Sequence, residues 1–351
     1  MKLTNYLGLP DPLFQAAKAD GHRMAGDISV TTLIDAPRIR LLKKQYPDVE
    51  QDLSEMVFMM LGTGLHTMYE RAGFTDSEAV HIKRTIDLYN IKLIEMQKEG
   101  NETGAKSLKA VIDFNQKYLD KFYPDIEKRY ISEKTLTLNV FDKVLSGTFD
   151  LYDKETKTLY DYKMCSVWAY VYPESRTKWT LQTNIYAHML RKAGYEVNKI
   201  EIVGIFRDWS ASAASRGADY PKSGIMVIPI ELADDNKVSK YIHDMMTLHI
   251  QAEQGNIPDC NGKDRWATSD KWAVIPFGAK IAKRVFDVEK DADIYIADNG
   301  FRFEKGLIKE HRPGENKRCD RYCPVRTVCP QLKAMNLERQ KTLVPTENQF
   351  E

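Results

Sequence analysis

The sequence predicts an α/β fold. Three observations support this class: a long helical segment comes first, three strand-like segments follow it, and an amphipathic helix then leads into a further strand. Each segment has the apolar periodicity of its type. The chain has 351 residues, of which 43% are hydrophobic, and is long enough to bury a sizeable core. We expect these elements at residues 52–72, 135–141, 144–153, 157–164, 176–191 and 200–206.

The first part of the chain is predicted to be mostly helical. Residues 1–50 mix loops with short helices. Between residues 52 and 72, apolar side chains recur every three or four positions, which indicates a buried helix. Residues 76–128 are charged and helical in pattern, and a Gly-Asn-Glu-Thr-Gly break at 100–104 predicts a helical hairpin inserted into the core.

The last part of the chain is predicted to contain one more strand and one more helix. These are expected at residues 225–230 and 232–254. From Pro258 to the C-terminal cysteines, Trp, Gly and Pro punctuate the sequence, and we expect a loop-rich region. We therefore divide the chain into a core of residues 1–231 and a region of residues 232–351 that packs on this core.

Composition limits the class of protein. The net charge is +1, so any phosphate-binding surface must be local. The sequence has no apolar run of transmembrane length and does not begin with a signal-peptide pattern, so we expect a cytoplasmic protein without membrane contact. Of the five cysteines, three lie between residues 319 and 329. In a reducing compartment, such clustering favours a metal site over disulfides.

The most informative segment runs from Gly147 to Lys163. It places Asp150 near the end of one strand-like segment and the triplet Asp161 to Lys163 in the next. Residues two apart on a strand point to the same face, so Asp161 and Lys163 emerge side by side, and Asp150 can join them from the neighbouring strand. Two carboxylates beside a lysine amine suit a site that hydrolyses phosphodiesters with a divalent metal.

Two helical patterns accompany this segment. Gly62 and His66 lie four apart, and so do Gln182 and Tyr186, so each pair shares one helix face. His66 is a candidate metal ligand, and the alternative is a core histidine satisfied by a hydrogen bond. Gln182 and Tyr186 could hold a phosphate or sugar, or could simply lie at the boundary of the core.

Four patterns thus follow one another: G-x-x-x-H at 62–66, G-x-x-D at 147–150, D-x-K at 161–163 and Q-x-x-x-Y at 182–186. In this order they resemble the PD-(D/E)XK nuclease superfamily. The likeness covers roughly residues 29–210 and is greatest to the RecB-like branch, which includes many phage exonucleases. The segment from Ser29 to Arg40 is similar to the opening helix of that branch. The resemblance implies a restriction-endonuclease-like core, which is a mixed β-sheet flanked by helices, here with a helical insertion and a Cys-rich C-terminal region.

The resemblance also implies roles for individual residues. The metal ligands would be His66, Asp150, Asp161 and the backbone carbonyl of Tyr162. Lys163 would orient water and stabilise phosphate charge. Gln182 and Tyr186 would complete the catalytic set beside the scissile strand. The reaction would be Mg²⁺- or Mn²⁺-dependent hydrolysis of DNA.

The implied function is that of an exonuclease in recombination, repair or phage genome processing, in a bacterial or phage-infected cytoplasm. It would act on single-stranded DNA or duplex ends, with a helicase or an annealing protein as a possible partner. The alternatives are a structure-selective endonuclease and a catalytically silent DNA-binding or scaffold subunit.

The C-terminal cysteines are similar to the last three ligands of the iron–sulfur cluster found in RecB-like nucleases. They are Cys319, Cys323 and Cys329, and Cys260 is the best fourth ligand because the usual early cysteine is missing. We expect a [4Fe–4S] cluster, with structural zinc or no metal as the alternatives. Neighbouring cations are expected to favour the thiolate form. Cys165 is predicted to be a buried, apolar-like residue.

Two segments are candidates for DNA contact. Just beyond Lys163, aromatic and cationic residues could stack bases and hold phosphates, or the aromatic rings could pack the loop onto the fold. A basic stretch before the cysteines could form a DNA track or a solvated charged face. The first segment contains Trp168, Tyr170, Arg176 and Lys178, and the second runs from Lys305 to Arg321.

Overall fold

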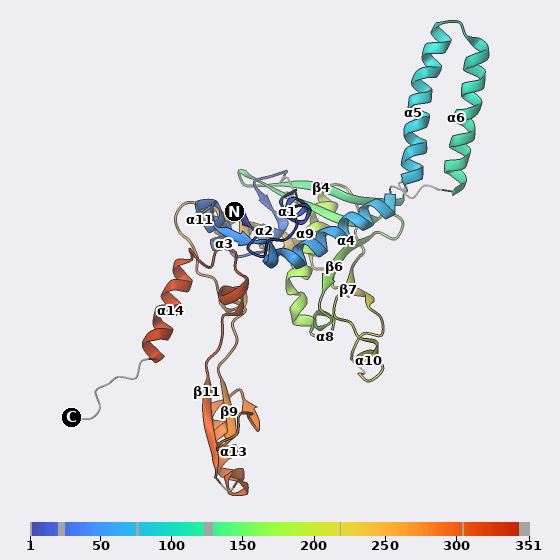
Figure 1. Cartoon of the computed structure of the whole chain (residues 1–351). Coiled ribbons are helices and arrows are strands. Elements are labelled where there is room, and N and C mark those ends of the chain that lie inside the picture. The colour runs from blue at the N-terminus through green and yellow to red at the C-terminus, as the bar shows by residue number, and fades with distance from the viewer. Residues whose placement is uncertain are drawn as a thin grey trace. The chain divides into compact units, whose positions relative to one another are not determined.

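The chain forms two compact units in the computed structural model (Figure 1), which describes residues 2–19, 25–74, 77–122, 129–217, 219–303 and 305–343. The larger unit comprises Thr4–Ile34 and Asp52–Thr247, and the smaller comprises Met1–Leu3, Asp35–Gln51 and Leu248–Glu351. The boundary expected at residue 231 falls inside the larger unit. There, His188 Nδ1 lies 2.8 Å from Asp235 Oδ1, so the start of the following helix is held to the core.

A mixed β-sheet flanked by helices forms the larger unit, as predicted. In the described part of the chain it has six strands, in the order β2-β5-β6-β7-β8, with β4 also paired to β5. The β4–β5, β5–β6 and β7–β8 pairs are antiparallel, whereas β2–β5 and β6–β7 are parallel. The strands are β2 (Ile28–Ser29), β4 (Tyr130–Val140), β5 (Lys143–Asp153), β6 (Thr158–Cys165), β7 (Lys199–Phe206) and β8 (Ile225–Ile230).

Alternate residues of these strands bury large apolar side chains. Phe149 and Leu159 are fully buried on β5 and β6, and Ile202 is fully buried on β7. Helix α9 (Thr177–Lys192) packs on β4, β5, β6 and β7, and contributes the buried Leu190. Each side chain of this kind contributes about 1.5–3 kcal/mol when it is fully buried. The core therefore fixes the register of the strands that carry the candidate site.

The predicted opening helix at residues 29–40 is two helices. Helix α2 (Val30–Leu33) ends at Ile34, and α3 (Pro37–Gln45) begins at Pro37. Proline has no backbone N–H and disfavours helical backbone in the residue before it, so it starts a helix more readily than it continues one.

The long helices lie where the sequence pattern places them. Helix α4 (Val57–Phe74) follows the 3₁₀-helix η1 (Leu53–Met56), and both lie near the predicted helix at 52–72. The expectation that this helix is buried was wrong, because several apolar side chains of α4 are exposed, among them Phe58 by 61% and Met68 by 54%. The predicted helical hairpin consists of α5 (Ser77–Lys98) and α6 (Glu102–Phe122). Ile86 of α5 packs with Ile112 and Leu119 of α6. The helix expected at 232–254 is α11 (Asp235–Glu253).

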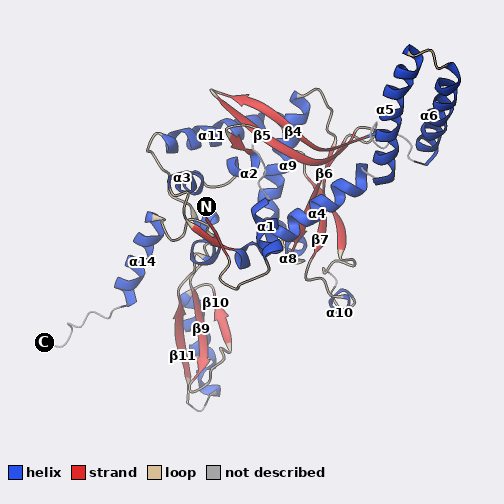
Figure 2. Ribbon diagram, turned by 45° about the horizontal axis from the view of Figure 1, so that its top comes forward, coloured by secondary structure: helices blue, strands red, loops and turns tan. Residues whose placement is uncertain are grey.

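The region expected to be loop-rich is instead partly folded into a sheet and a helix (Figure 2), so this prediction was wrong. We call residues 271–312 the finger. Its three antiparallel strands are short, and β11 is mostly exposed, so its sequence lacks the apolar alternation of a half-buried strand. The strands are β9 (Lys271–Pro276), β10 (Arg284–Phe286) and β11 (Leu307–Arg312), and they pair in the order β10-β9-β11. The helix is α13 (Glu289–Asn299).

The remaining elements are short or lie near the termini. Strands β1 and β3 pair with each other. The two strands are β1 (Lys2–Thr4) and β3 (Glu50–Asp52). The remaining helices are α1 (Asp11–Ala19), α8 (Trp168–Val171), η2 (Pro173–Arg176), α10 (Ala211–Ala214), α12 (Gly262–Arg265), η3 (Gly300–Arg302), the π-helix η4 (Arg318–Tyr322) and α14 (Pro330–Leu343).

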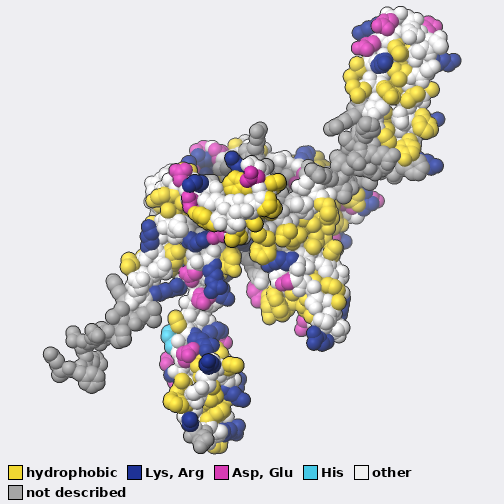
Figure 3. All heavy atoms as spheres, in the orientation of Figure 1, with side chains coloured by type: hydrophobic (Ala, Val, Ile, Leu, Met, Phe, Trp, Pro, Cys, Tyr) yellow, Lys and Arg dark blue, Asp and Glu magenta, His cyan; other side chains and the backbone are white. Residues whose placement is uncertain are grey.

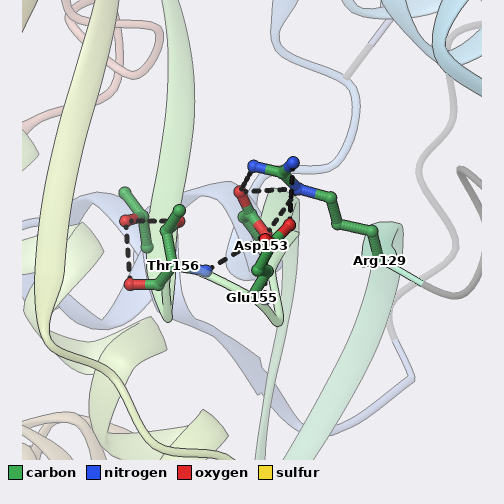
Figure 4. Close-up of polar contacts among 5 residues, drawn as sticks. Arg129, Asp153, Glu155 and Thr156 are labelled. Carbon is green, nitrogen blue, oxygen red and sulfur yellow. Dashed lines mark hydrogen bonds and ion pairs between the residues drawn. The ribbon is translucent and has the colours of Figure 1, made fainter.

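An ion pair between the buried Asp153 and the half-exposed Arg129 holds the turn between β5 and β6 (Figure 4). Asp153 is 1% exposed and accepts hydrogen bonds from the Arg129 guanidinium and from the backbone N–H groups of Glu155 and Thr156. The Arg129 hydrogen bonds, and then these backbone bonds, lower the pKa of Asp153 from 3.8 to about 2. The carboxylate therefore stabilises the fold above pH 3.8, and this contribution is lost as the pH falls toward 2.

We expect Asp153→Asn to lower the free energy of unfolding at pH 7 by about 1–2 kcal/mol, because Arg129 is half-exposed and solvent weakens the pair. Urea unfolding at pH 7 and pH 3 tests this, since the difference from the wild type should shrink at the lower pH. The matched control is Glu155→Gln, which removes an exposed partner of the same arginine and should cost under about 1 kcal/mol. If the difference in unfolding free energy between the wild type and Asp153→Asn is the same at both pH values, the ionised carboxylate of Asp153 is not its source.

Candidate active site

Strands β5 and β6 bring Asp150 and Asp161 to neighbouring positions. The antiparallel register pairs Leu151 with Tyr160, so the next positions along the ladder are Asp150 and Asp161. Asp150 Oδ2 accepts a hydrogen bond of 2.6 Å from the backbone N–H of Tyr162. Both carboxylates are buried, at 7% and 1% exposure. The two acidic groups predicted to converge therefore lie together across the hairpin.

His66 joins Asp150 from helix α4, and a second carboxylate joins them from β4. His66 Nδ1 lies 3.5 Å from Asp150 Oδ1 and 3.7 Å from Glu133 Oε1. One ligand atom from each of the three residues lies within 4.8 Å of the others, so the group could hold a metal ion. An imidazole and two carboxylates suit Mn²⁺ and are compatible with Mg²⁺.

Glu133 is the site residue that sequence reasoning missed. On β4 it lies between Ser132, which pairs with Leu151, and Lys134, which pairs with Phe149, and so it faces Asp150. Its φ of 44° is in the left-handed region, which is unfavourable for a residue with a Cβ atom. A single acidic residue in a charged strand gives no motif, so the sequence held no signal for it.

Asp161 and Lys163 form an ion pair inside the site. Lys163 Nζ lies 2.6 Å from Asp161 Oδ2. Both carboxylate oxygens of Asp161 are buried, and within the described part of the chain Oδ1 has no hydrogen bond while Oδ2 has only the ion pair with Lys163. Buried carboxylates normally accept several hydrogen bonds or bind a metal. The unsatisfied Oδ1 fits the predicted role of Asp161 as a metal ligand, although Asp161 is not part of the group of three around His66.

The pKa shifts of these groups have clear physical causes. Burial, and then the neighbouring Asp161, raise the pKa of Asp150 to about 7. The hydrogen bond to Glu133 raises the pKa of His66 against the opposing effect of burial. Burial alone would lower the pKa of Lys163, but the carboxylates of Asp161 and Asp150 raise it above its ordinary value. The site thus brings together carboxylates whose charge a bound cation would stabilise.

Gln182 and Tyr186 point toward each other at this site. Gln182 Nε2 donates a hydrogen bond of 3.1 Å to the Tyr186 hydroxyl. Tyr186 is 4% exposed, and its pKa is raised by burial and by the charges of Asp161 and Asp150. Gly147 makes room for the ring, because a Cβ atom there would lie 2.6 Å from Tyr186 Cε1. This glycine is therefore required by the close approach of α9 to β5.

The segment after Lys163 contains both packed and exposed aromatic rings. Tyr170 packs edge-on against Phe206, as expected for a ring that holds the loop on the fold. Trp168 and Tyr172 are half-exposed and stack on each other, with ring centroids 5.8 Å apart. Tyr170 and Arg176 line a cavity of about 530 Å³, which the loop at 219–222 and strand β8 complete. Lys178 lies on the first turn of α9.

The four predicted ligand cysteines lie together in the smaller unit. Cys260, Cys323 and Cys329 are buried in one cluster with side chains of α3 and α14, and the half-buried Cys319 packs against it. Cys165 is buried in the larger unit and does not belong to this cluster, as predicted. Segments far apart in the sequence thus deliver their thiols to one place.

Polar contacts beside the cysteines fix these segments. Gln331 accepts a hydrogen bond from the backbone N–H of Cys260 and donates one to its carbonyl, both 2.9 Å long. Arg38 donates to the carbonyls of Ile257 and Pro258, just before Cys260. Arg318, just before Cys319, forms two hydrogen bonds with Asp35, of 2.7 and 2.6 Å. The backbone around the cluster is therefore held by side chains that make several bonds each.

The thiols do not have the lowered pKa that sequence reasoning expected. Burial raises the pKa of Cys260 to about 12 and also raises the pKa values of Cys319 and Cys323. Arg265 and Arg318 act in the expected direction on Cys319 and Cys323, but burial outweighs them. Without a metal these thiols stay protonated, so metal binding would release protons.

Comparisons with known proteins do not identify a family. No family model matches the chain, and no curated protein matches it. Among solved structures, the chain is similar to the crystal structure of SSO0001, with 15% identity and a TM-score of 0.36, over 69% of this chain and 88% of that one. It is also similar to a phage-related exonuclease from Haemophilus somnus 129PT, with 12% identity and a TM-score of 0.26, over 54% of this chain and 88% of that one. Likenesses this weak establish neither a shared family nor a shared activity.

Among the described residues, the helices are all too short or too polar to span a bilayer.

Proposed function

We propose that the chain is a divalent-metal-dependent nuclease with a PD-(D/E)XK core that hydrolyses phosphodiester bonds in DNA. The observation that carries the proposal is the convergence of His66, Glu133 and Asp150 within 4.8 Å, beside the Asp161–Lys163 ion pair. A site that only binds a metal has no need of a lysine held against its carboxylates. A hydrolytic site does, because negative charge builds up on the phosphate as the bond breaks.

The residues of the site would divide the work as follows. His66, Glu133, Asp150 and Asp161 would hold the cation, with the carbonyl of Tyr162 as a further ligand. A bound Mg²⁺ or Mn²⁺ would polarise the phosphate and promote ionisation of water. Lys163 would orient the attacking water and stabilise the charge on the phosphate.

Gln182 and Tyr186 would position the scissile strand. Their hydrogen bond aligns an amide and a phenol beside the carboxylates without adding charge to the site. The DNA beyond the scissile phosphate would contact the segment after Lys163, through Trp168, Tyr170, Arg176 and Lys178. The exposed Trp168–Tyr172 stack and the cavity lined by Tyr170 and Arg176 support this role, since both offer rings or a cation to an unpaired nucleotide.

We propose that Cys260, Cys319, Cys323 and Cys329 hold a structural [4Fe–4S] cluster. The four thiols share one cluster although Cys260 is far from the others in the sequence, which supports a common ligand role. Four cysteine thiolates are the usual ligands of a [4Fe–4S] cluster, and structural zinc bound by the same four thiols is the alternative.

We further propose an exonuclease that acts on single strands or duplex ends in recombination, repair or phage genome processing, with a helicase or an annealing protein as its partner. A structure-selective endonuclease has the same site chemistry and is the second candidate. A silent DNA-binding subunit is disfavoured because it would have no chemical need for Asp150, Asp161 and Lys163 together.

Circular and linear DNA distinguish these functions. With Mn²⁺, we expect end-labelled linear DNA to be degraded and covalently closed circular DNA to stay intact, because an exonuclease needs an end. Gel electrophoresis of both substrates, with and without a chelator, measures this. Cleavage of the circle would support the endonuclease. No cleavage of either substrate with Mg²⁺ or Mn²⁺ would contradict a nuclease.

A further inference from the structure

The finger separates paired charges from unpaired ones. Along its strands and the start of α13, charged side chains are matched. Lys309 lies 2.7 Å from Glu289 and 2.6 Å from Asp293. The other matched pairs are Lys271 with Asp287, Arg312 with Glu310, and His311 with Asp270 just before the finger. Much of the basic stretch considered as a DNA track is therefore neutralised by neighbouring acids.

The tip of the finger, residues 277–283, 300–303 and 305–306, has a different surface. Large apolar side chains are exposed there: Phe277 by 61%, Ile281 by 82% and Phe301 by 79%. Figure 3 shows hydrophobic side chains interspersed with Lys and Arg on the finger. The cations at the tip are exposed, and none forms an ion pair with another described residue; they are Lys280, Lys283, Arg302 and Lys305.

Backbone hydrogen bonds hold the two loops of the tip together. The N–H of Phe277 donates to the carbonyl of Gly306 over 3.1 Å, and the N–H of Lys283 donates to Val274 over 2.8 Å. Gly278 and Gly306 have φ values of 82° and 77°, which side chains rarely adopt. The Arg302 guanidinium lies over the Phe301 ring, 5.3 Å from its centroid. The exposed rings and cations are thus presented by one ordered surface.

We propose that the tip of the finger binds single-stranded nucleic acid. Phe277 and Phe301 stack on unpaired bases, and the four cations hold the phosphates on either side. Aromatic rings interleaved with cations are the combination that binds single strands without sequence preference. A partner protein would need a matched set of acids to pair four cations, whereas a phosphate backbone supplies regularly spaced negative charge. This binding needs no metal and does not depend on the proposed hydrolysis.

We expect Phe301→Leu to weaken the binding of a fluorescent oligothymidylate by about fivefold or more, and Phe301→Tyr to bind as the wild type does. Leucine keeps the apolar character but cannot stack. Fluorescence anisotropy of the full-length chain in EDTA measures the affinity and prevents cleavage. Phe114→Ala is the matched control, since Phe114 is 69% exposed on α6. Thermal unfolding should be the same for all these variants.

The salt dependence tests the cations. Replacing both Lys280 and Lys283 by alanine should reduce the slope of log affinity against log salt concentration by about 1.4, at about 0.7 for each phosphate contact on a single strand. Lys290→Ala, which removes an exposed lysine at the start of α13, should leave the slope unchanged.

Two results would overturn the proposal. One is wild-type affinity and slope in both the Phe301→Leu and the lysine variants. The other is a wild type that shows no measurable affinity for the oligothymidylate in EDTA. Failure of the nuclease proposal is separate, because that would appear as absent cleavage with Mn²⁺ while binding in EDTA persists.

Discussion

Lys163→Ala is expected to reduce Mn²⁺-dependent hydrolysis of DNA at least about a hundredfold, with little change in DNA affinity. Lys163 Nζ lies 2.6 Å from Asp161 Oδ2 and is the cationic side chain that the hairpin holds beside the carboxylates. Its charge is needed most as negative charge develops on the phosphate, and less while the strand merely binds. Initial rates on end-labelled linear DNA and anisotropy in EDTA separate the two effects.

The same hairpin offers a matched control for this variant. Lys157 lies in the turn before β6, forms an exposed ion pair with Glu196, and is remote from the carboxylates in the strand register. Lys157→Ala should therefore leave hydrolysis unchanged. Lys163→Met keeps the long apolar stem and removes the charge. If both Lys163 variants lose hydrolysis but unfold at the wild-type temperature, the charge of Lys163 acts in the reaction and not in folding. Full activity in either would rule out the mechanism.

The sequence predicted the parts of the site that depend on local periodicity. Asp161 and Lys163 share a strand face because they are two residues apart, and Gln182 and Tyr186 share a helix face because they are four apart. Asp150 could be placed beside them because a short turn joins adjacent strands. The structure brings these groups together, with His66 of α4 added. Residue spacing within single strands and helices was therefore enough to predict most of the candidate site.

The parts that the sequence did not predict depend on tertiary contacts. Glu133 reaches His66 only through the β4–β5 register and a left-handed backbone conformation, and neither leaves a sequence pattern. The finger was missed because the exposed strand β11 has no apolar alternation. The raised thiol pKa values followed from burial, which no spacing of cations reveals. In each case the residue type was known, but its burial or its neighbours in the fold could not be predicted from the sequence.

Cys260 lies between these two cases. Its distance along the chain from Cys319 gives no geometric information, and the sequence predicts it as the fourth ligand only because the usual early cysteine is missing. The fold places it in the cluster through Gln331, which bonds to both sides of its peptide group. The fourth thiol is therefore positioned by a side chain that follows Cys329 closely in the sequence.

Cys329→Ser is expected to remove the bound metal and to destabilise the smaller unit. In structural zinc sites, metal binding contributes on the order of 10 kcal/mol to folding. The cluster buries few large apolar side chains besides the thiols, so a metal bound by these thiols would contribute much of its stability. Purified without oxygen, the wild type should be brown and contain iron and sulfide. The variant should be colourless and unfold at lower temperature by circular dichroism.

Cys165→Ser is the control, because Cys165 is an equally buried cysteine that lies outside the cluster. It should keep the full metal content, since a buried hydroxyl in place of a thiol changes local stability alone. A colourless wild type that releases zinc to a chelator would assign the same four ligands to zinc. Equal metal content in Cys329→Ser and the wild type would exclude a metal site here, because a site with one ligand missing cannot retain full occupancy through extended dialysis against a chelator.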